Sequence, residues 1–227
     1  MSSLVAFYRS SIGKKVIMGI TGLIGIGFVI AHMAGNLLAF AGARKINEYS
    51  ATLHGPLGEL LWVLRIVLIV AVVLHVLMAY QLTRMSWDAR PVAYQRKTPQ
   101  VSTLASRTMK WGGVLLLVFI VFHVLHFTTQ TVDPAGWRGM DDMRGDRDIY
   151  GNLIASFRIW WVSLFYILAM AALGLHLFHG AWSSLRTLGY AKQSGHPLKR
   201  QIAFILAIVI WAGFTLIPLS VMLGILH

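Results

Sequence analysis

Cysteine is absent from the 227-residue chain, and acidic residues are scarce, with eight Asp and Glu against twenty Lys and Arg. Without cysteine the protein forms no disulfide, no thiolate cluster and no covalent haem attachment through a Cys-x-x-Cys-His motif. Any metal ion must therefore be held by histidine or carboxylate. Charged residues make up only 12% of the chain, and a soluble domain needs more charge than this on its surface.

Hydrophobic residues make up 57% of the sequence and gather in five long apolar runs. About 20 apolar residues suffice for a helix to cross a bilayer. We therefore expect an all-α integral membrane bundle of five transmembrane helices, forming one domain over residues 1–227. The expected spans are residues 16–40, 57–83, 111–130, 159–183 and 201–226. The polar segments 41–56 and 131–157 are interpreted as loops.

The first apolar run admits a competing interpretation as a signal peptide, because the small residues at 39–43 resemble a cleavage site. The run is too long for a typical signal peptide and contains His32 and Asn36, so we favour a retained helix. A stripe of glycines on this helix favours close helix packing, although a flat macrocycle would use the same space. These glycines are Gly19, Gly22, Gly25 and Gly27.

The basic residues are distributed unevenly between the two ends of the spans. The N-terminal segment and the linkers 84–110 and 186–200 carry 13 Lys and Arg but one acid, Asp88, whereas the other connecting segments, counted with Glu59 and Arg158, carry six bases and seven acids. The positive-inside rule then places the N-terminus in the cytoplasm and the C-terminus outside. We expect a multi-pass protein of a bacterial-type cytoplasmic (inner) membrane. Topology also explains the net charge of +12, so no nucleic-acid partner is expected.

Four of the five expected spans contain histidine, and an ionisable side chain inside hydrocarbon is a functional candidate by default. The first and third spans run outward and the second and fourth run inward, and each carries histidine near its carboxyl end. Two pairs of histidines, one in each half of the membrane, are therefore predicted. The histidines are His32 in the first span, His75 in the second, His123 and His126 in the third, and His176 and His179 in the fourth.

Paired imidazoles at two depths favour haem over other metal centres. Zinc prefers three or four ligands gathered at one depth, and a di-iron carboxylate site needs acidic residues that these spans lack. Two b-type haems, each held by two histidines, would form an electron path across the bilayer. The alternative is a packing role, which is the simpler interpretation of any one histidine taken alone.

Within each pair we choose His123 and His179 as axial ligands. His123 sits deeper than His126, and Gly180 after His179 leaves room for a porphyrin edge. His126 and His176 are then alternative ligands, or bond propionates, quinone or a neighbouring helix. The three other histidines fall in loops or at the terminus and are expected on the surface: His54, His196 and His227.

Haem propionates are anions near the membrane faces and need cationic partners. Lys15, Arg107 and Arg186 are candidates at the inner face, and Arg158 is a candidate at the outer face. Each is equally readable as a snorkelling anchor at the interface, with its alkyl stem in the apolar layer.

The chain resembles the cytochrome b membrane-anchor subunit of succinate dehydrogenase and fumarate reductase, in its single-chain dihaem form. The resemblance covers essentially the whole chain and lies in the order of four local signatures rather than in any one of them. These are SIGKK at residues 11–15, AHMAGN at 31–36, HVLHFTTQ at 123–130 and HGAWS at 179–183. It implies two haem b groups as cofactors. It pairs His32 with His123 for the haem distal from the catalytic subunits, and His75 with His179 for the proximal one.

The resemblance also implies partners and a reaction. A flavoprotein subunit with FAD and an iron–sulfur subunit would dock on the cytoplasmic side, with the basic linker 84–110 as a docking face. Electrons would pass through the haems between the iron–sulfur subunit and membrane quinone, menaquinone being favoured over ubiquinone. Such a complex joins the tricarboxylic acid cycle to the respiratory chain and can form higher oligomers. The anchor itself would not oxidise succinate.

Quinone reduction takes up protons, and an acid at the membrane edge would supply them. Glu48 and Glu59 near the second span are candidates, since the family has a glutamate in that region; solvated loop acids are the alternative. Two other functions fit parts of the sequence. The first is a dihaem cytochrome b subunit of a membrane hydrogenase or formate dehydrogenase, and the second is a haem-free transporter or scaffold.

Overall fold

The fold is built from helices in the computed structural model. The structure describes residues 3–90, 92, 102–142, 145, 147–191 and 197–227. Five segments are long and apolar enough to cross a membrane. They are α2 (Ser11–Leu37) with the 3-10 turn η1 (Leu38–Ala41), α4 (Gly58–Asp88), α5 (Leu104–His123) with the π-helical turn η2 (Val124–Thr128), α7 (Trp160–Thr187) and α8 (Pro197–Met222). The predicted all-α fold with five spans is confirmed, and the protein is a multi-pass membrane protein.

Two helices bordering the basic linker are longer than predicted. The second span continues to Asp88 rather than to residue 83, and the third begins at Leu104 rather than at residue 111. The Thr103 hydroxyl accepts a hydrogen bond from the Ser106 amide (3.2 Å) and so caps the start of α5. Hydropathy locates only the apolar part of a helix, so it missed these polar ends.

The prediction of loops at 41–56 and 131–157 was wrong in part, because each contains a helix. These are α3 (Ala43–His54) and α6 (Ile149–Arg158), in addition to the N-terminal α1 (Ser3–Arg9). Gly42, with φ of 95°, makes the turn into α3 that an L side chain would resist. Asp148 caps α6 by accepting from the Gly151 amide (2.9 Å). Both helices are too short and too polar to span a membrane.

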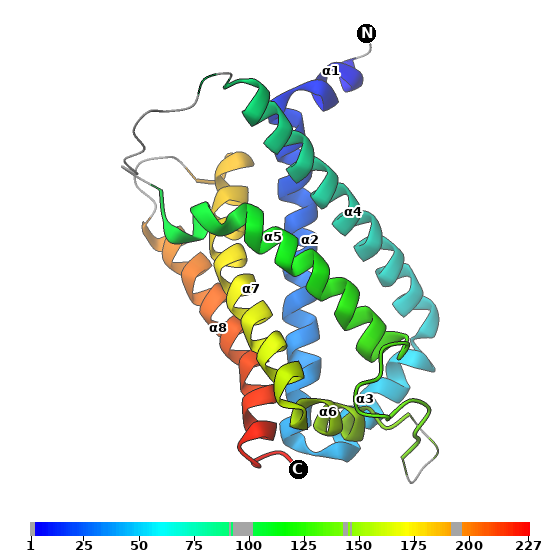
Figure 1. Ribbon diagram of the computed structural model, residues 1–227. Helices are drawn as coiled ribbons and strands as arrows, with labels where there is room; N and C mark the ends of the chain where they lie inside the picture. The colour runs from blue at the N-terminus through cyan, green and yellow to red at the C-terminus, as the bar shows by residue number, and fades with distance from the viewer. Residues whose placement is uncertain (1–2, 91, 93–101, 143–144, 146, 192–196) are drawn as a thin grey trace.

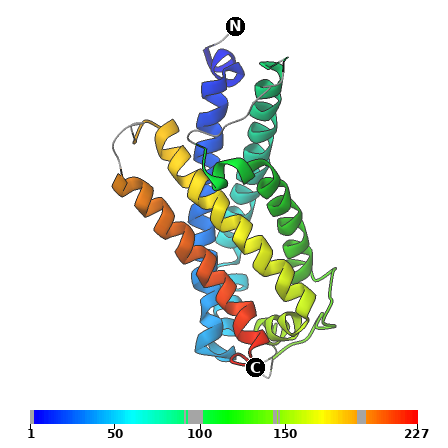
Figure 2. The same cartoon turned by 60° about the vertical axis from the view of Figure 1, so that its left-hand side comes forward.

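The bundle is organised around α2 and α7. Helix α2 packs on α4, α7 and α8, while α7 packs on α5 and α8 (Figures 1 and 2). The backbones of α2 and α5 do not pack closely, and neither do those of α4 and α7. The termini lie at opposite ends of the bundle, as an odd number of crossings requires (Figure 1).

Helices α3 and α6 close the end of the bundle at which the C-terminus lies (Figure 1). Asn47 on α3 is 4% exposed. Its Nδ2 donates to Asp142 Oδ2 (3.2 Å) and to Asp148 Oδ1 (3.1 Å), and its Oδ1 accepts from the Tyr150 amide (3.0 Å). One buried amide therefore ties α3 to the segment that leads into α6.

Replacing Asn47 with alanine is expected to loosen this end of the bundle. The change removes one hydrogen bond from each of two carboxylates and the acceptor of a backbone amide, which costs about 1–3 kcal/mol and lowers the melting temperature by roughly 3–10 °C. Thermal unfolding of the detergent-solubilised protein measures it. Arg44→Ala, at an exposed site on the same helix, is the matched control. Equal melting temperatures for the two variants would contradict the assignment.

Candidate functional site

His32 on α2 and His123 on α5 lie face to edge near the end of the bundle closed by α3 and α6. Their ring centroids are 5.6 Å apart, with an interplanar angle of 75°. Phe28 stacks on His32 at 5.2 Å, and Phe119 stacks on His123 at 5.6 Å. The imidazoles therefore bridge two helices whose backbones do not pack closely.

A second pair joins α4 to α7. The ring of His75 lies 6.2 Å from the ring of His176, with an interplanar angle of 58°. His179, the preferred ligand, lies one helical turn further along α7 and is half-buried. The structure thus brings His176 to His75, and the choice of His179 over His176 stays a prediction.

The hydrogen bonds of His75 determine which of its nitrogens carries the proton. Nδ1 lies 3.1 Å from the Met18 carbonyl oxygen, which can only accept, so Nδ1 donates. The Thr21 hydroxyl, 3.3 Å away, donates to the Ile17 carbonyl and is free to accept from the same nitrogen. Nε2 of His75 therefore keeps its lone pair, the state of an imidazole that ligates a metal.

The two pairs lie at well-separated levels. His75 contacts α2 at Met18 and Thr21, which precede His32 by fourteen and eleven residues. At a rise of about 1.5 Å per residue, these intervals correspond to roughly 17–21 Å along α2. On α7, the residue bonded to His123 is Tyr166, ten residues before His176, or about 15 Å. The separations along α2 and along α7 therefore agree that the two histidine pairs lie at different depths.

A chain of buried hydrogen bonds connects His123 to α6. The Ser156 hydroxyl donates to Asn152 Oδ1 (3.0 Å), so its oxygen accepts from His126 Nε2–H (3.0 Å). His126 Nδ1 then accepts from the Tyr166 hydroxyl (3.0 Å). The Tyr166 oxygen in turn accepts from His123 Nδ1–H (3.2 Å).

This chain separates the two histidines of the third span. His126 is 1% exposed and uses both ring nitrogens in hydrogen bonds. His123 uses only Nδ1 in the chain, which leaves Nε2 with a lone pair. The geometry favours His123 over His126 as a metal ligand. His126 lies in the π-helical turn η2, a form of helix that occurs frequently at functional sites.

His32, the partner of His123, has no hydrogen bond that determines which of its ring nitrogens carries the proton. The Asn36 side-chain nitrogen donates to the His32 carbonyl (2.7 Å) and lies 3.3 and 3.4 Å from the two ring nitrogens of His32. Since it is nearly equidistant from both, it favours neither tautomer. His176 differs again, because its Nδ1 is buried and has no hydrogen-bond partner among the described residues.

Each pair places two imidazoles from different helices next to each other. The observed separations are 5.6 and 6.2 Å. Within the described part of the chain, no three His, Asp or Glu residues gather to hold a metal ion. Each site thus offers two protein ligands, the set that a b-type haem takes.

Some glycines of α2 and α7 lie against a neighbouring helix, and others border open space. A Cβ on Gly22 would meet the His75 ring at 3.3 Å, and one on Gly19 would meet Ser184 at 3.8 Å, so these two serve close packing. A Cβ on Gly25, Gly27 or Gly180 would meet no described atom from elsewhere in the fold within 4 Å. The described residues therefore leave space beside Gly180, and a porphyrin edge in that space stays a prediction.

The charged candidates lie at the two ends of the spans. Lys15, Arg107 and Arg186 are exposed on α2, α5 and α7 at the end of the bundle that holds the N-terminus, and Arg158 is exposed at the opposite end. Glu59 is exposed in the first turn of α4, and Glu48 on α3 is partly buried. Their roles toward haem propionates and quinone stay predictions.

The histidines outside the spans have local structural contacts. His54 is exposed; it donates from Nδ1 to the Ser50 carbonyl (2.9 Å) and accepts at Nε2 from Arg65 (3.2 Å). Arg65, the one basic residue well inside an apolar run, thereby pairs with α3 at the bundle end. The His227 carbonyl accepts from the Tyr150 hydroxyl (3.3 Å). His196 lies outside the described residues.

Sequence reasoning missed Tyr166, Ser156 and Asn152, which complete the buried chain. Each of the three lies among apolar residues in the sequence, and a polar side chain buried there needs a hydrogen-bond partner. That signal marks them as members of some network, but it does not say which histidine they meet.

No protein-family model, no curated protein and no solved structure matches this chain. The fold and the paired histidines define its class, a five-span helical membrane protein with two inter-helical histidine pairs. The function is therefore argued from the residues of the site.

Proposed function

We propose that the chain is the dihaem cytochrome b anchor of a succinate:quinone oxidoreductase, that is, of a succinate dehydrogenase or fumarate reductase complex. The observation that carries the proposal is the pair of imidazole bridges, His32 to His123 and His75 to α7, at two depths. Each bridge joins two helices whose backbones do not pack closely. A transporter or scaffold has no need of two such bridges.

Some residues of the site would orient the histidine ligands, and others would keep water away from them. Bound haem would supply one-electron transfer between the iron–sulfur partner and membrane quinone. The Met18 carbonyl orients His75, and the Tyr166 hydroxyl orients His123, each by accepting a hydrogen bond from Nδ1–H so that Nε2 keeps its lone pair. Apolar and aromatic side chains such as Phe28 and Phe119 keep water from the rings.

The ends of the bundle supply the remaining roles. Lys15, Arg107 and Arg186 would neutralise propionates on one face, and Arg158 on the other. Glu48 or Glu59 would deliver protons to quinone at the face closed by α3 and α6. The basic end, cytoplasmic by the positive-inside rule, would receive the iron–sulfur and flavoprotein subunits.

Purification of the tagged chain from its native membrane tests the proposal. We expect a flavoprotein and an iron–sulfur protein to copurify and succinate to reduce the haem. Reduction by hydrogen or formate but not by succinate would instead establish the hydrogenase or formate dehydrogenase alternative. A preparation without haem would favour the transporter or scaffold.

Tyr166→Phe is expected to weaken haem binding at the His123 site. The variant keeps the ring packing but removes the oxygen that accepts from His123 and donates to His126. Loss of such an orienting partner typically lowers metal affinity about 10–100-fold. Haem titration of the apoprotein and the midpoint potential of each haem measure it. Tyr150→Phe is the matched control; identical titrations and potentials for both variants would exclude a positioning role for Tyr166.

A further inference from the structure

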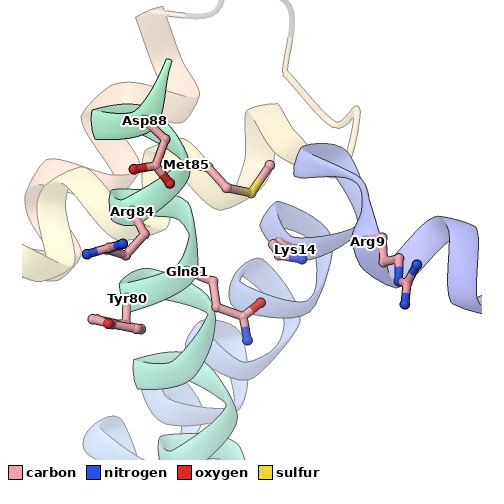
Figure 3. Close-up of a pocket in the computed structure, with 7 residues that line it drawn as sticks. All are labelled: Arg9, Lys14, Tyr80, Gln81, Arg84, Met85 and Asp88. Carbon is pink, nitrogen blue, oxygen red and sulfur yellow. The ribbon is translucent and has the colours of Figure 1, made fainter. Parts of the chain in front are cut away.

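Two open cavities follow one another along the seam between α2 and α4. The first, of about 500 Å³, lies at the end that holds the N-terminus and is lined by Arg9, Lys14, Arg84 and Asp88 together with Tyr80 and Met85 (Figure 3). The second, of about 400 Å³, lies deeper in the bundle. Thr21 is its one polar lining residue, and the Thr21 hydroxyl is bonded to the Ile17 carbonyl.

The cavities share one seam because their linings recur at helical spacing. On α2, Lys14 of the first cavity is followed by Ile17, Thr21 and Ile24 of the second, three or four residues apart and so on one face. The ten residues from Lys14 to Ile24 extend about 15 Å along the helix axis. The seam therefore runs from a polar end into the apolar layer.

The polar end carries excess positive charge, with three basic residues against one acid. Lys14 is 7% exposed; its ammonium donates to the Tyr8 carbonyl (2.9 Å) and lies 4.7 Å from the Tyr8 ring centroid. These contacts hold the charge at the cavity wall. Beside it, α1 exposes Leu4 (78%) and Phe7 (44%), as expected of a helix at the membrane interface.

We propose that this seam binds one anionic phospholipid, with its phosphate in the basic cavity and one acyl chain in the apolar groove. An anionic headgroup complements a lining of three basic residues and one acid better than a headgroup without net charge, and a free anion would leave the groove empty. The site needs only that the chain spans a membrane, so it stands independently of the haem assignment.

Native mass spectrometry of the delipidated full-length protein, with any copurifying subunits, tests this site. Phosphatidylglycerol is expected to bind in a single tight step. Its affinity should exceed that of phosphatidylcholine with the same acyl chains roughly 25-fold, because the cavity carries two net positive charges and each contributes about fivefold. Arg84→Gln should weaken phosphatidylglycerol about fivefold. Arg200→Gln, an exposed arginine on α8, should leave it unchanged. Equal affinities for the two lipids would overturn the proposal.

The apolar groove is tested with a second pair of variants. Val70 lines the groove and is 52% exposed, whereas Val73 does not line it and is 51% exposed. Val70→Trp should fill the groove and remove the tight step, while Val73→Trp should retain it. Equal binding by these two variants would overturn the proposal, and so would displacement of the lipid by equimolar inorganic phosphate, which would indicate a small-anion site.

Discussion

His32→Ala and His123→Ala are each expected to remove one haem of two and to leave the other in place. The rings of the two histidines are neighbours across α2 and α5, so under the proposed function loss of either would leave the haem iron at that level with a single protein ligand. The level of His75 lies about 15–21 Å away along the helices and should retain its haem. The haem content of the purified variants, measured against protein concentration, should fall by half.

His54→Ala and His126→Ala are the controls for this experiment. His54 is exposed and hydrogen-bonded to Arg65, so its variant should keep both haems. His126 uses both nitrogens in hydrogen bonds, so its loss should disturb packing without removing an axial ligand. A full haem content in His123→Ala, together with half the content in His126→Ala, would assign the ligand to His126.

His75→Ala is expected to abolish electron transfer from succinate to quinone. The variant removes the haem at the level nearer the basic end, where the partner subunits would dock, and so interrupts the only path we propose. Succinate oxidation with a soluble artificial acceptor should persist, because it uses the partner subunits alone. Undiminished quinone reduction by the variant would contradict the proposed path.

Haem content also assigns the partner of His75 on α7. His176 faces His75 at 6.2 Å, whereas the resemblance to the cytochrome b anchors favours His179. Whichever alanine variant loses the haem identifies the ligand. Loss from His179→Ala alone would mean that α7 rotates relative to α4 when the cofactor is bound.

The spans could be predicted from the sequence because hydrocarbon selects for long apolar runs with few charges. The polar helices α3 and α6 were missed, since their stability depends on packing at the end of the bundle. Ile46 on α3 and Phe157 on α6 belong to one buried cluster. Such long-range packing leaves little trace in local composition.

The pairing of histidines on four helices followed from depth and chain direction, but the choice within each helix did not. His123 and His126 lie on one face of the third span and both contact Tyr166, and only the second hydrogen bond of His126, to Ser156, distinguishes them. His176 and His179 differ by one turn of α7, so their selection depends on the rotation of that helix. A periodic pattern does not specify rotation to that accuracy.

The haem-to-chain ratio of the purified wild-type protein tests the central claim most directly. A pyridine haemochrome assay, combined with electron paramagnetic resonance of the oxidised protein, counts the haems and reports their axial ligands. The account predicts two b-type haems per chain, both low-spin with two histidine ligands. A protein that is folded and purified from haem-replete cells yet carries no haem would contradict it.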